Sequence, residues 1–276
     1  LIELGEVDDS LRFILQKAGF ATRSSQGARS SEAFNKFNQG KLQRSARLGN
    51  PPLASPAISR YTKGEEIGTR EVYGQILAEL GKTDKNIYVL DADVKNSTYS
   101  QDFLKVHPDR FIECFIAEQN MVGVAIGLSR LQKKPFVSTF ASFLTRAADQ
   151  IRMAGLSHAN IAFVGSHAGV SIGEDGASQM GLEDISLFGA IPGSVVLHPS
   201  DAVSTAHLIK ELYEFSGISY LRTLRPKTPV LYQSTDTFRI GGSKVVKSSA
   251  KDVLTIAACG IALHEGEPHP LQQSGN

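Results

Sequence analysis

Short apolar runs alternate with longer amphipathic segments between about residues 61 and 225, and this alternation limits the possible folds more than any other feature of the sequence. Runs such as Ile87–Leu90 and Ile161–Gly165 contain almost no polar residue, which is typical of strands buried on both faces of a parallel sheet. The segments between them have the apolar spacing of helices. The pattern therefore predicts an α/β fold, a doubly wound parallel sheet with helices on both faces.

The boundaries of the predicted elements follow from capping residues and apolar runs. We expect Thr69 to cap a helix that ends at Gly81, and Ser200 or Asp201 to cap a later one. The predicted strands are 87–90, 111–116, 135–140, 161–165, 194–197 and 218–221, and the predicted helices are 69–81, 118–131, 143–156 and 201–215. After Pro226 the alternation ends, and we expect strands at 230–232, 244–247 and 253–257.

The chain divides into three parts by composition. Residues 1–60 hold a short predicted helix within 1–20 and a polar linker with seven basic residues and one acidic residue over 21–60. This basic excess suits either a solvated linker or an anionic partner such as RNA. Residues 61–228 form the predicted main domain, and 229–276 a linker with the incomplete start of a C-terminal domain. Because the chain starts at Leu1, we expect it to be part of a longer product, or a truncated version of one.

Charge and cysteine content exclude several functional classes. The formal net charge is +1, from 29 basic and 28 acidic residues, which gives no electrostatic support for a nucleic-acid or membrane partner. The only cysteines, Cys114 and Cys259, form neither a disulfide framework nor a zinc motif, so we expect a reducing, cytoplasmic location. No apolar run is long enough to span a membrane, and no signal peptide is recognisable.

Ligands of open parallel sheets bind at the carboxyl ends of the strands, so polar residues there are the first candidates for a site. They are, in chain order, Asp91, Asp93, Ser97, Glu118, His167, Glu174, Asp175, Arg222 and Arg225, together with the aromatic Phe143. A carboxylate at a helix start, such as that of Glu118, has two interpretations. It either complements the helix dipole or, held away from water, serves in acid–base catalysis.

A glycine-rich segment at 165–176 follows one predicted strand and has four glycines in twelve positions. It matches neither a phosphate-binding loop nor a dinucleotide fingerprint. Within it, His167 and Asp175 suit either a proton-transfer pair or hydrogen bonds within the loop. The arginines at 70, 222 and 225 suit either a bidentate phosphate clamp or solvated surface positions.

Taken in order, these segments resemble the pyrimidine-binding domain of transketolases, the thiamine-diphosphate enzymes of the pentose phosphate pathway. The resemblance is nearly continuous from about residue 60 to 264, and the animal-type enzymes and transketolase-like proteins are the most similar. It is carried by the segments Ile67–Gln75, Leu90–Thr98, Arg110–Met121, Ser138–Arg146, Gly165–Met180 and Leu221–Pro226.

The resemblance implies a role for each matched residue. Glu118 would hydrogen-bond N1′ of the aminopyrimidine ring and take part in catalysis, Phe143 would stack on that ring, and Gln179 would lie beside the cofactor. The matched substrate residues are His167 and Asp175, for the sugar hydroxyls, and Arg70, Ser97 and Arg225, for the sugar phosphate. Lys95, Asn96 and Thr98 would only shape a turn.

The implied activity is transfer of a two-carbon glycolaldehyde unit from a ketose phosphate to an aldose phosphate by a cytoplasmic homodimer. The implied cofactors are thiamine diphosphate and Mg²⁺ or Ca²⁺. The family binds the metal through a Gly-Asp-Gly motif in an earlier domain, and this chain has no such motif. We therefore expect the metal ligands on a homodimer partner or a separate diphosphate-binding domain, and this chain alone to be incomplete for catalysis.

Two alternatives remain at this stage. The first is another thiamine-diphosphate enzyme, such as 1-deoxyxylulose-5-phosphate synthase or the beta subunit of a 2-oxo-acid dehydrogenase. The phosphate-binding positions and the 165–176 loop argue against it. The second is a truncated, non-catalytic transketolase-like protein that acts by pairing with partners. The absence of a metal-binding motif supports it, whereas the retention of every matched site residue argues against it.

Overall fold

The computed structural model describes residues 60–249, 252–253 and 255–265. The predictions for residues 1–59 lie outside this range. The described residues belong to two compact units, one made of 60–240 with 259–265 and the other of 241–258. The first unit contains the sheet and the candidate site. None of the described helices combines the length and the apolar character that a membrane span needs.

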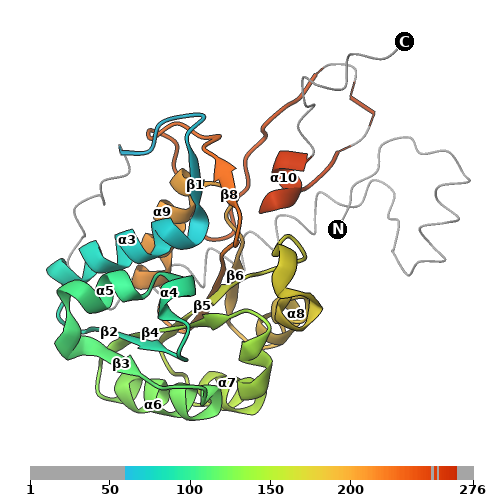
Figure 1. Cartoon of the computed structure of the whole chain (residues 1–276). Helices are drawn as coiled ribbons and strands as arrows, with labels where there is room; N and C mark the ends of the chain where they lie inside the picture. Colours follow the sequence, from blue (N-terminus) through green and yellow to red (C-terminus); the bar gives the residue numbers. More distant parts are fainter. Residues whose placement is uncertain (1–59, 250–251, 254, 266–276) are drawn as a thin grey trace, which may run out of the picture. The chain divides into compact units, whose positions relative to one another are not determined.

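A six-stranded, entirely parallel sheet forms the centre of the larger unit (Figure 1), which confirms the predicted doubly wound α/β fold. Its strand order is β3-β2-β4-β5-β7-β6. The chain moves outward from β2 to β3 on one side and to β4 on the other, so the topological switch point lies between β2 and β4. The strands are β2 (Ile87–Asp91), β3 (Phe111–Glu113), β4 (Lys134–Phe140), β5 (Ile161–Ser166), β6 (Val195–Leu197) and β7 (Ile218–Arg222).

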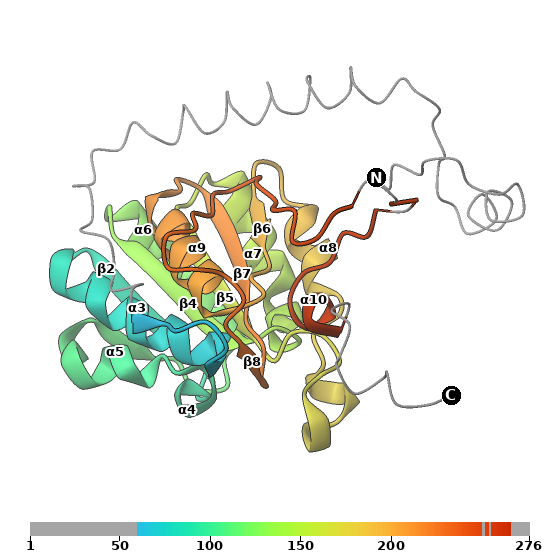
Figure 2. The ribbon, with the colours of Figure 1, turned by 90° about the horizontal axis from the view of Figure 1, so that it is seen from above.

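Helices cover both faces of this sheet (Figures 1 and 2), and side chains of alternate strand residues enter two separate cores. Val89 of β2, for example, packs in the core beneath α3 (Thr69–Thr83) and α9 (Ala202–Glu214). Its neighbour Leu90 packs in the other core, beneath α6 (Glu118–Arg130) and α7 (Ala148–Leu156). Burial on both faces explains why the strand sequences are almost continuously apolar.

Helix α3 differs from its prediction at both ends. Gly68, not Thr69, is the N-cap residue, and the Thr69 hydroxyl instead accepts a hydrogen bond from the amide of Leu224 at 2.8 Å. The helix continues through Gly81 to Thr83, and the glycine serves close packing instead of ending the helix: an added Cβ would lie 2.5 Å from atoms of Phe103 and His107. By contrast, Asp201 does cap α9 as predicted, in a capping box with Ser204.

Two predicted elements are shorter or divided. Strand β3 ends at Glu113 instead of continuing to residue 116, because Phe115 takes a left-handed φ of 53°. Phe115 and Ile116 are exposed as a result. The predicted helix 143–156 consists of a 3-10 segment, η3 (Phe143–Ala147), followed by α7.

The predictions after Pro226 are wrong in detail. The strand there is β8 (Lys227–Pro229), which pairs antiparallel with β1 (Glu66–Gly68). At the predicted strand 230–232, the amides of Leu231 and Tyr232 donate to the Asp201 carboxylate, each at 3.0 Å. The described residues of 244–247 and 253–257 include no strand, because none of them forms a ladder with another.

Several short helices were not predicted. They are α4 (Lys95–Thr98), α5 (Gln101–Val106), η2 (Pro108–Arg110), η4 (Gly173–Asp175), η5 (Ala177–Gln179), α8 (Asp184–Gly189) and α10 (Ile261–Glu265). Most of them lie in loops between strands, where too few residues are available to show a helical period.

Candidate active site

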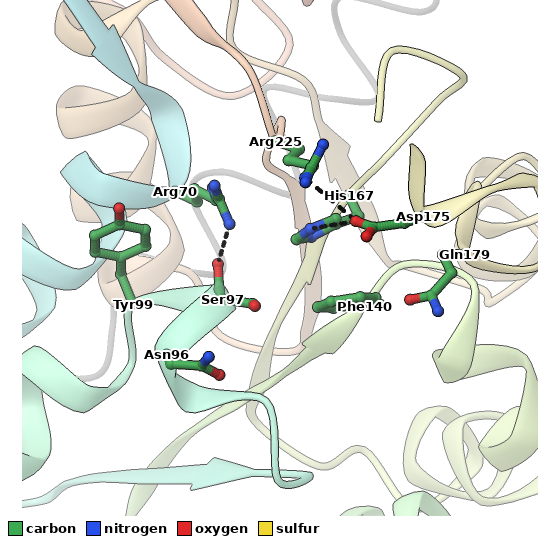
Figure 3. A pocket seen from close by; sticks show the side chains of 9 residues that line it. All are labelled: Arg70, Asn96, Ser97, Tyr99, Phe140, His167, Asp175, Gln179 and Arg225. Carbon is green, nitrogen blue, oxygen red and sulfur yellow. Dashed lines mark hydrogen bonds and ion pairs between the residues drawn. The ribbon is translucent and has the colours of Figure 1, made fainter. Parts of the chain in front are cut away.

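A polar cavity of about 370 Å³ opens at the carboxyl ends of the strands, beside the switch point between β2 and β4 (Figure 3). Every predicted substrate residue lines it, and so does the predicted cofactor residue Gln179. The complete lining is Arg70, Asn96, Ser97, Tyr99, Phe140, His167, Asp175, Gln179 and Arg225. The fold therefore brings together side chains from distant parts of the sequence, such as Arg70 and Arg225. The residues just before these two, Thr69 and Leu224, are joined by a hydrogen bond although they are 155 residues apart.

The first wall of the cavity comes from the turn that follows β2 and from the first turn of α3. Arg70 donates from Nη1 to the Ser97 carbonyl at 2.9 Å, and its Cζ lies 5.4 Å from the centre of the Tyr99 ring. Burial lowers the pKa of Arg70 from its ordinary value, but a guanidinium remains charged at neutral pH. This wall presents one fixed cation to the cavity.

The second wall begins at His167, directly after β5. Its ring is buried and stacks on Phe140, with 3.8 Å between the ring centres and 17° between the planes. Nδ1 lies 2.9 Å from the Ser166 hydroxyl, and Nε2 lies 3.7 Å from Asp175 Oδ2. Burial, with a further contribution from the Arg70 guanidinium, lowers the pKa of His167 to about 4. The imidazole is therefore neutral at physiological pH and able to accept a hydrogen bond or a proton from a bound hydroxyl group.

Arg225 completes the second wall and is held entirely by groups of the glycine-rich loop. Its Nη2 lies 2.9 Å from Glu174 Oε1, its Nε lies 3.2 Å from Asp175 Oδ2, and its Nη1 donates to the carbonyl of Ile172. Glu174 and Asp175 lie on η4, which begins at Gly173 and is followed by Gly176, with φ of 79° and 82° at the two glycines. The glycines are needed at these positions because side chains disfavour such angles.

Neither interpretation of Arg222, as part of a phosphate clamp or as a solvated surface cation, fits the structure. Arg222 is buried, and it donates to Asp184 Oδ2 at 2.7 Å and to the carbonyl of Gly181 at 2.9 Å. Tyr220 also donates to Asp184, at 2.6 Å. This network ties β7 to α8 and keeps Arg222 out of the cavity lining.

The two remaining predicted residues, Glu118 and Phe143, both contact Arg146 and do not line the cavity. They are joined by Arg146, whose Nη1 donates to Glu118 Oε1 and whose Cζ lies 4.2 Å from the centre of the Phe143 ring. Glu118 is the buried first residue of α6. Phe143 stacks on Phe140 at 5.0 Å, and Phe140 in turn stacks on His167. A column of three rings thus connects the Glu118 region with the cavity.

Sequence reasoning missed Phe140, Tyr99 and Asn96 as lining residues. Phe140 is the last residue of β4, so the rule that pointed to the other strand ends applied to it as well. Asn96 was expected only to shape a turn, but its side chain lines the cavity. Lys95 and Thr98 do serve the turn, through contacts with Glu113 and Asp91 respectively.

The fold and the site define an α/β protein with a polar cavity at a sheet switch point, and comparison with known proteins specifies the family. The family model "Transketolase, pyrimidine binding domain" matches residues 65–230. The chain is 51% identical over 248 residues to mouse transketolase-like protein 2, which covers 85% of this chain and 40% of that protein. It is 50% identical to human transketolase over 214 residues, 77% of this chain and 34% of the human protein. The chain belongs to the transketolase family.

Solved structures agree with this assignment. A structure titled "Split gene transketolase, inactive beta4 tetramer" is 40% identical, with a TM-score of 0.60, over 67% of this chain and 60% of that one. A transketolase from Campylobacter jejuni has a TM-score of 0.65 over 78% of this chain and 34% of that one, and at 23% identity it shows the shared fold alone. The chain spans two fifths or less of the length of the two curated relatives.

Proposed function

We propose that this chain supplies the pyrimidine-binding and sugar-phosphate-binding part of a transketolase. The reaction would transfer a two-carbon glycolaldehyde unit from a ketose phosphate to an aldose phosphate in the pentose phosphate pathway. The observation that carries the proposal is the convergence of every predicted substrate residue on one cavity, with the Glu118–Phe143 pair next to it.

The proposed phosphate end of the cavity is formed by Arg70, Ser97 and Arg225. Two guanidinium groups from opposite walls suit a dianion because each can donate two parallel hydrogen bonds to it. His167 and Asp175 would then contact the sugar hydroxyls further along the substrate. The neutral His167 imidazole can accept a proton there, and the Asp175 carboxylate near Nε2 stabilises the charge that results.

Glu118 and Phe143 have the chemistry needed for the aminopyrimidine part of thiamine diphosphate. A planar, nitrogen-bearing group already occupies both contacts in this structure, namely the guanidinium of Arg146, which lies over the Phe143 ring and hydrogen-bonds Glu118. The same two surfaces would accept an aminopyrimidine, with the Glu118 carboxyl group holding a proton at N1′. Bound thiamine diphosphate supplies the electron sink for breaking the carbon–carbon bond.

The described residues contain no group of three or more His, Cys, Asp or Glu side chains that could hold a metal ion. Because the sequence lacks the Gly-Asp-Gly motif through which the family binds the metal, the proposal assigns the diphosphate and its Mg²⁺ or Ca²⁺ to a diphosphate-binding domain on another chain, either a homodimer partner or a separate subunit. The proposal also keeps two expectations from the sequence. One is a cytoplasmic location, from the low cysteine content, and the other is a main domain over residues 61–228.

One observation favours a second candidate function, a non-catalytic pairing protein. The 40% identical split-gene relative is described as an inactive tetramer of its beta chains. A chain of this kind can thus fold and associate without being active, and the two candidates must be separated by an activity measurement.

The test is to mix this chain with the separately expressed diphosphate-binding part of human transketolase, thiamine diphosphate and Mg²⁺. Transfer from xylulose 5-phosphate to ribose 5-phosphate is then measured. We expect turnover from the mixture, none from either part alone, and none when this chain carries Glu118→Ala. A mixture that forms a stable complex without turnover would favour the pairing function. Normal turnover with Glu118→Ala would contradict the role of Glu118.

A further inference from the structure

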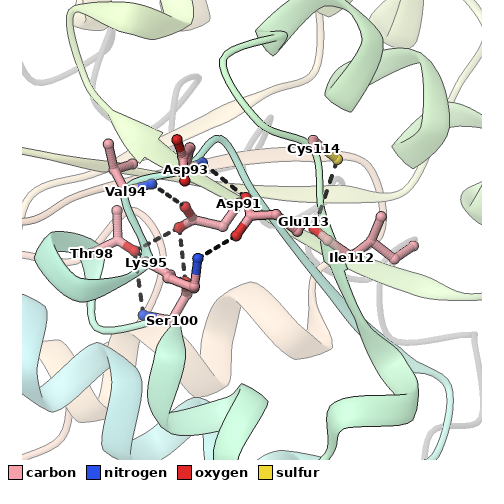
Figure 4. A network of polar contacts seen from close by, with 9 residues as sticks. All are labelled: Asp91, Asp93, Val94, Lys95, Thr98, Ser100, Ile112, Glu113 and Cys114. Atoms are coloured by element: carbon pink, nitrogen blue, oxygen red, sulfur yellow. Dashed lines mark hydrogen bonds and ion pairs between the residues drawn. The ribbon is translucent and has the colours of Figure 1, made fainter.

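Asp91 lies outside the cavity but organises the turn that forms one of its walls (Figure 4). It is the last residue of β2 and is fully buried. Its carboxylate accepts three hydrogen bonds: from the Val94 amide at 2.7 Å, the Thr98 hydroxyl at 2.7 Å and the Ser100 hydroxyl at 2.8 Å. Val94 precedes α4, Thr98 is its last residue and Ser100 follows it, so a single carboxylate closes the whole turn.

The carboxylate is satisfied by neutral donors and not by a direct ion pair. Burial raises the pKa of Asp91 to about 6, and the hydrogen bonds from Thr98, Val94 and Ser100 oppose this rise. A buried charge of this kind is costly, and it persists only where several hydrogen bonds replace its hydration. Leucine or valine would suit this last position of a buried strand better if packing were the only requirement.

The turn needs such support because its backbone is strained at both ends. Asp93 and Tyr99 have φ of 64° and 62°, in the left-handed region that side chains disfavour. Close packing holds the same turn from the other side: a Cβ at Gly74 would lie 2.3 Å from the Tyr99 carbonyl oxygen. The polypeptide between these two strained residues is the part that lines the cavity, through Asn96 and Ser97.

The position of Arg70 depends on this turn. Its Nη1 donates to the Ser97 carbonyl, and its guanidinium lies over the ring of Tyr99. A change in the turn would therefore move the Ser97 side chain and release one of the two cations proposed to bind phosphate.

We propose that Asp91 is a positioning residue for phosphate binding, which acts by fixing the α4 turn and, through the Ser97 carbonyl, the guanidinium of Arg70. This inference rests on the proposed function, in which Arg70, Ser97 and Arg225 hold the sugar phosphate. Asp91 itself does not contact the substrate.

The test is the variant Asp91→Asn, which keeps the shape of the side chain but replaces one acceptor oxygen by a donor. Binding of ribose 5-phosphate to the whole chain is measured by NMR titration. We expect affinity to fall at least fivefold and the slowly exchanging side-chain N–H signal of Arg70 to be lost, with an unchanged far-UV circular dichroism spectrum. The matched control is Asp102→Asn, the same change at an aspartate of α5 whose carboxylate pairs with Lys105 at 2.7 Å and not with the α4 turn. It should change the affinity less than twofold.

Further variants separate the possible failures. If Asp91→Asn does not fold, Ser100→Ala replaces it, because this change removes one donor and leaves the carboxylate; we expect a two- to threefold loss of affinity and a shifted Arg70 signal. Wild-type affinity and an unchanged Arg70 signal in the folded variant, while Arg225→Ala loses binding, would overturn the role of Asp91 alone. Wild-type binding by Arg225→Ala would instead contradict the proposed phosphate site, and the role of Asp91 with it.

Discussion

Arg222 and Arg225 are three residues apart, and the sequence suggests the same role for both, yet their surroundings differ completely. Arg222 is 6% exposed and paired with Asp184, which is 0% exposed. Arg225 is paired with Glu174, whose side chain is 82% exposed, and with Asp175, at 32%. Residue type does not distinguish a structural arginine from one that is available to a ligand; the burial of its partners does.

The physical reason is the free-energy cost of replacing the carboxylate partner of each arginine by another anion. A buried ion pair has lost its hydration, so removal of one member leaves a charge that neither water nor a ligand can reach. A pair at the surface is weak, and its members exchange readily with other ions. Arg222 is therefore fixed within the fold, whereas Arg225 can exchange Glu174 for a phosphate.

The largest expected difference between the two arginines is in stability. Asp184→Ala leaves Arg222 buried without its partner and should lower the free energy of unfolding by about 3–5 kcal/mol. The measurement is urea denaturation followed by circular dichroism. Asp175→Ala is the matched control, because it removes a carboxylate from Arg225 in a hydrated environment and should shift the midpoint much less. Equal shifts of the urea midpoint in the two variants would mean that burial does not make the Arg222 ion pair more important for stability than the Arg225 pair.

The next difference is in ligand binding. Arg225→Ala should weaken binding of ribose 5-phosphate by about tenfold or more, because hydrogen bonds between a cation and a phosphate are among the stronger polar contacts. The affinity for unphosphorylated ketoses should fall much less, and competition experiments can measure both affinities. Arg152→Ala, an exposed arginine of α7 paired with Asp149, serves as the control and should have no effect. A similar loss for both kinds of sugar would contradict a phosphate role.

Each arginine also has a histidine neighbour that reports on it. Burial lowers the pKa of both His167 and His198 to about 4; Arg70 and, less strongly, Arg225 add to this for His167, against the opposing Asp175, and Arg222 adds to it for His198. Arg225→Ala should therefore raise the pKa of His167 and leave that of His198 unchanged, as measured by NMR titration of the ring protons. A shift of both values would show that the variant disturbs the fold and not one local charge.

The same pKa values set the sign of the pH dependence of stability. An unfolded histidine binds its proton near pH 6.5, whereas these two bind it only near pH 4. Between these values the unfolded state carries more protons, so this contribution to the free energy of unfolding decreases as the pH falls from 6.5 to 4.

The smallest expected effect is a gain of affinity. Glu174 is the exposed carboxylate that a phosphate must replace on Arg225, so Glu174→Gln should strengthen the binding of inorganic sulfate by about two- to fivefold. The control is Glu79→Gln, which removes an exposed carboxylate paired with Lys82 on α3. Weaker sulfate binding by Glu174→Gln would show that Glu174 supports the anion site instead of competing for it.

The parts of the fold that the sequence predicted well are those governed by local burial. Strands β2, β5 and β7 lie within one residue of their predicted limits because both of their faces are buried, and an apolar run then ends where the strand ends. The candidate site could be predicted only in part from the rule that a parallel sheet places its polar strand ends at one edge. Of the strand-end residues, Ser97, His167, Asp175 and Arg225 line the cavity, whereas Asp91, Asp93, Glu118, Phe143, Glu174 and Arg222 do not.

The errors occur where contacts distant in sequence decide the structure. Gly81 was expected to end α3, but it lies inside the helix, where the absence of a side chain lets Phe103 and His107 pack closely. Leu231 does not continue a strand, because its amide bonds Asp201. Asp91 shows the same limit for the site: nothing in a strand-end aspartate indicates whether it faces the ligand or closes a turn behind it.

The guanidinium of Arg146, between Glu118 and the ring of Phe143, has a kinetic consequence. Any flat ligand that uses these two surfaces must substitute for an ion pair instead of filling an open space. Its association rate would then level off at high ligand concentration, at the rate at which Arg146 leaves Glu118. At high ligand concentration, the rate of binding in this part of the molecule would be limited by the movement of the Arg146 side chain and not by the ligand concentration.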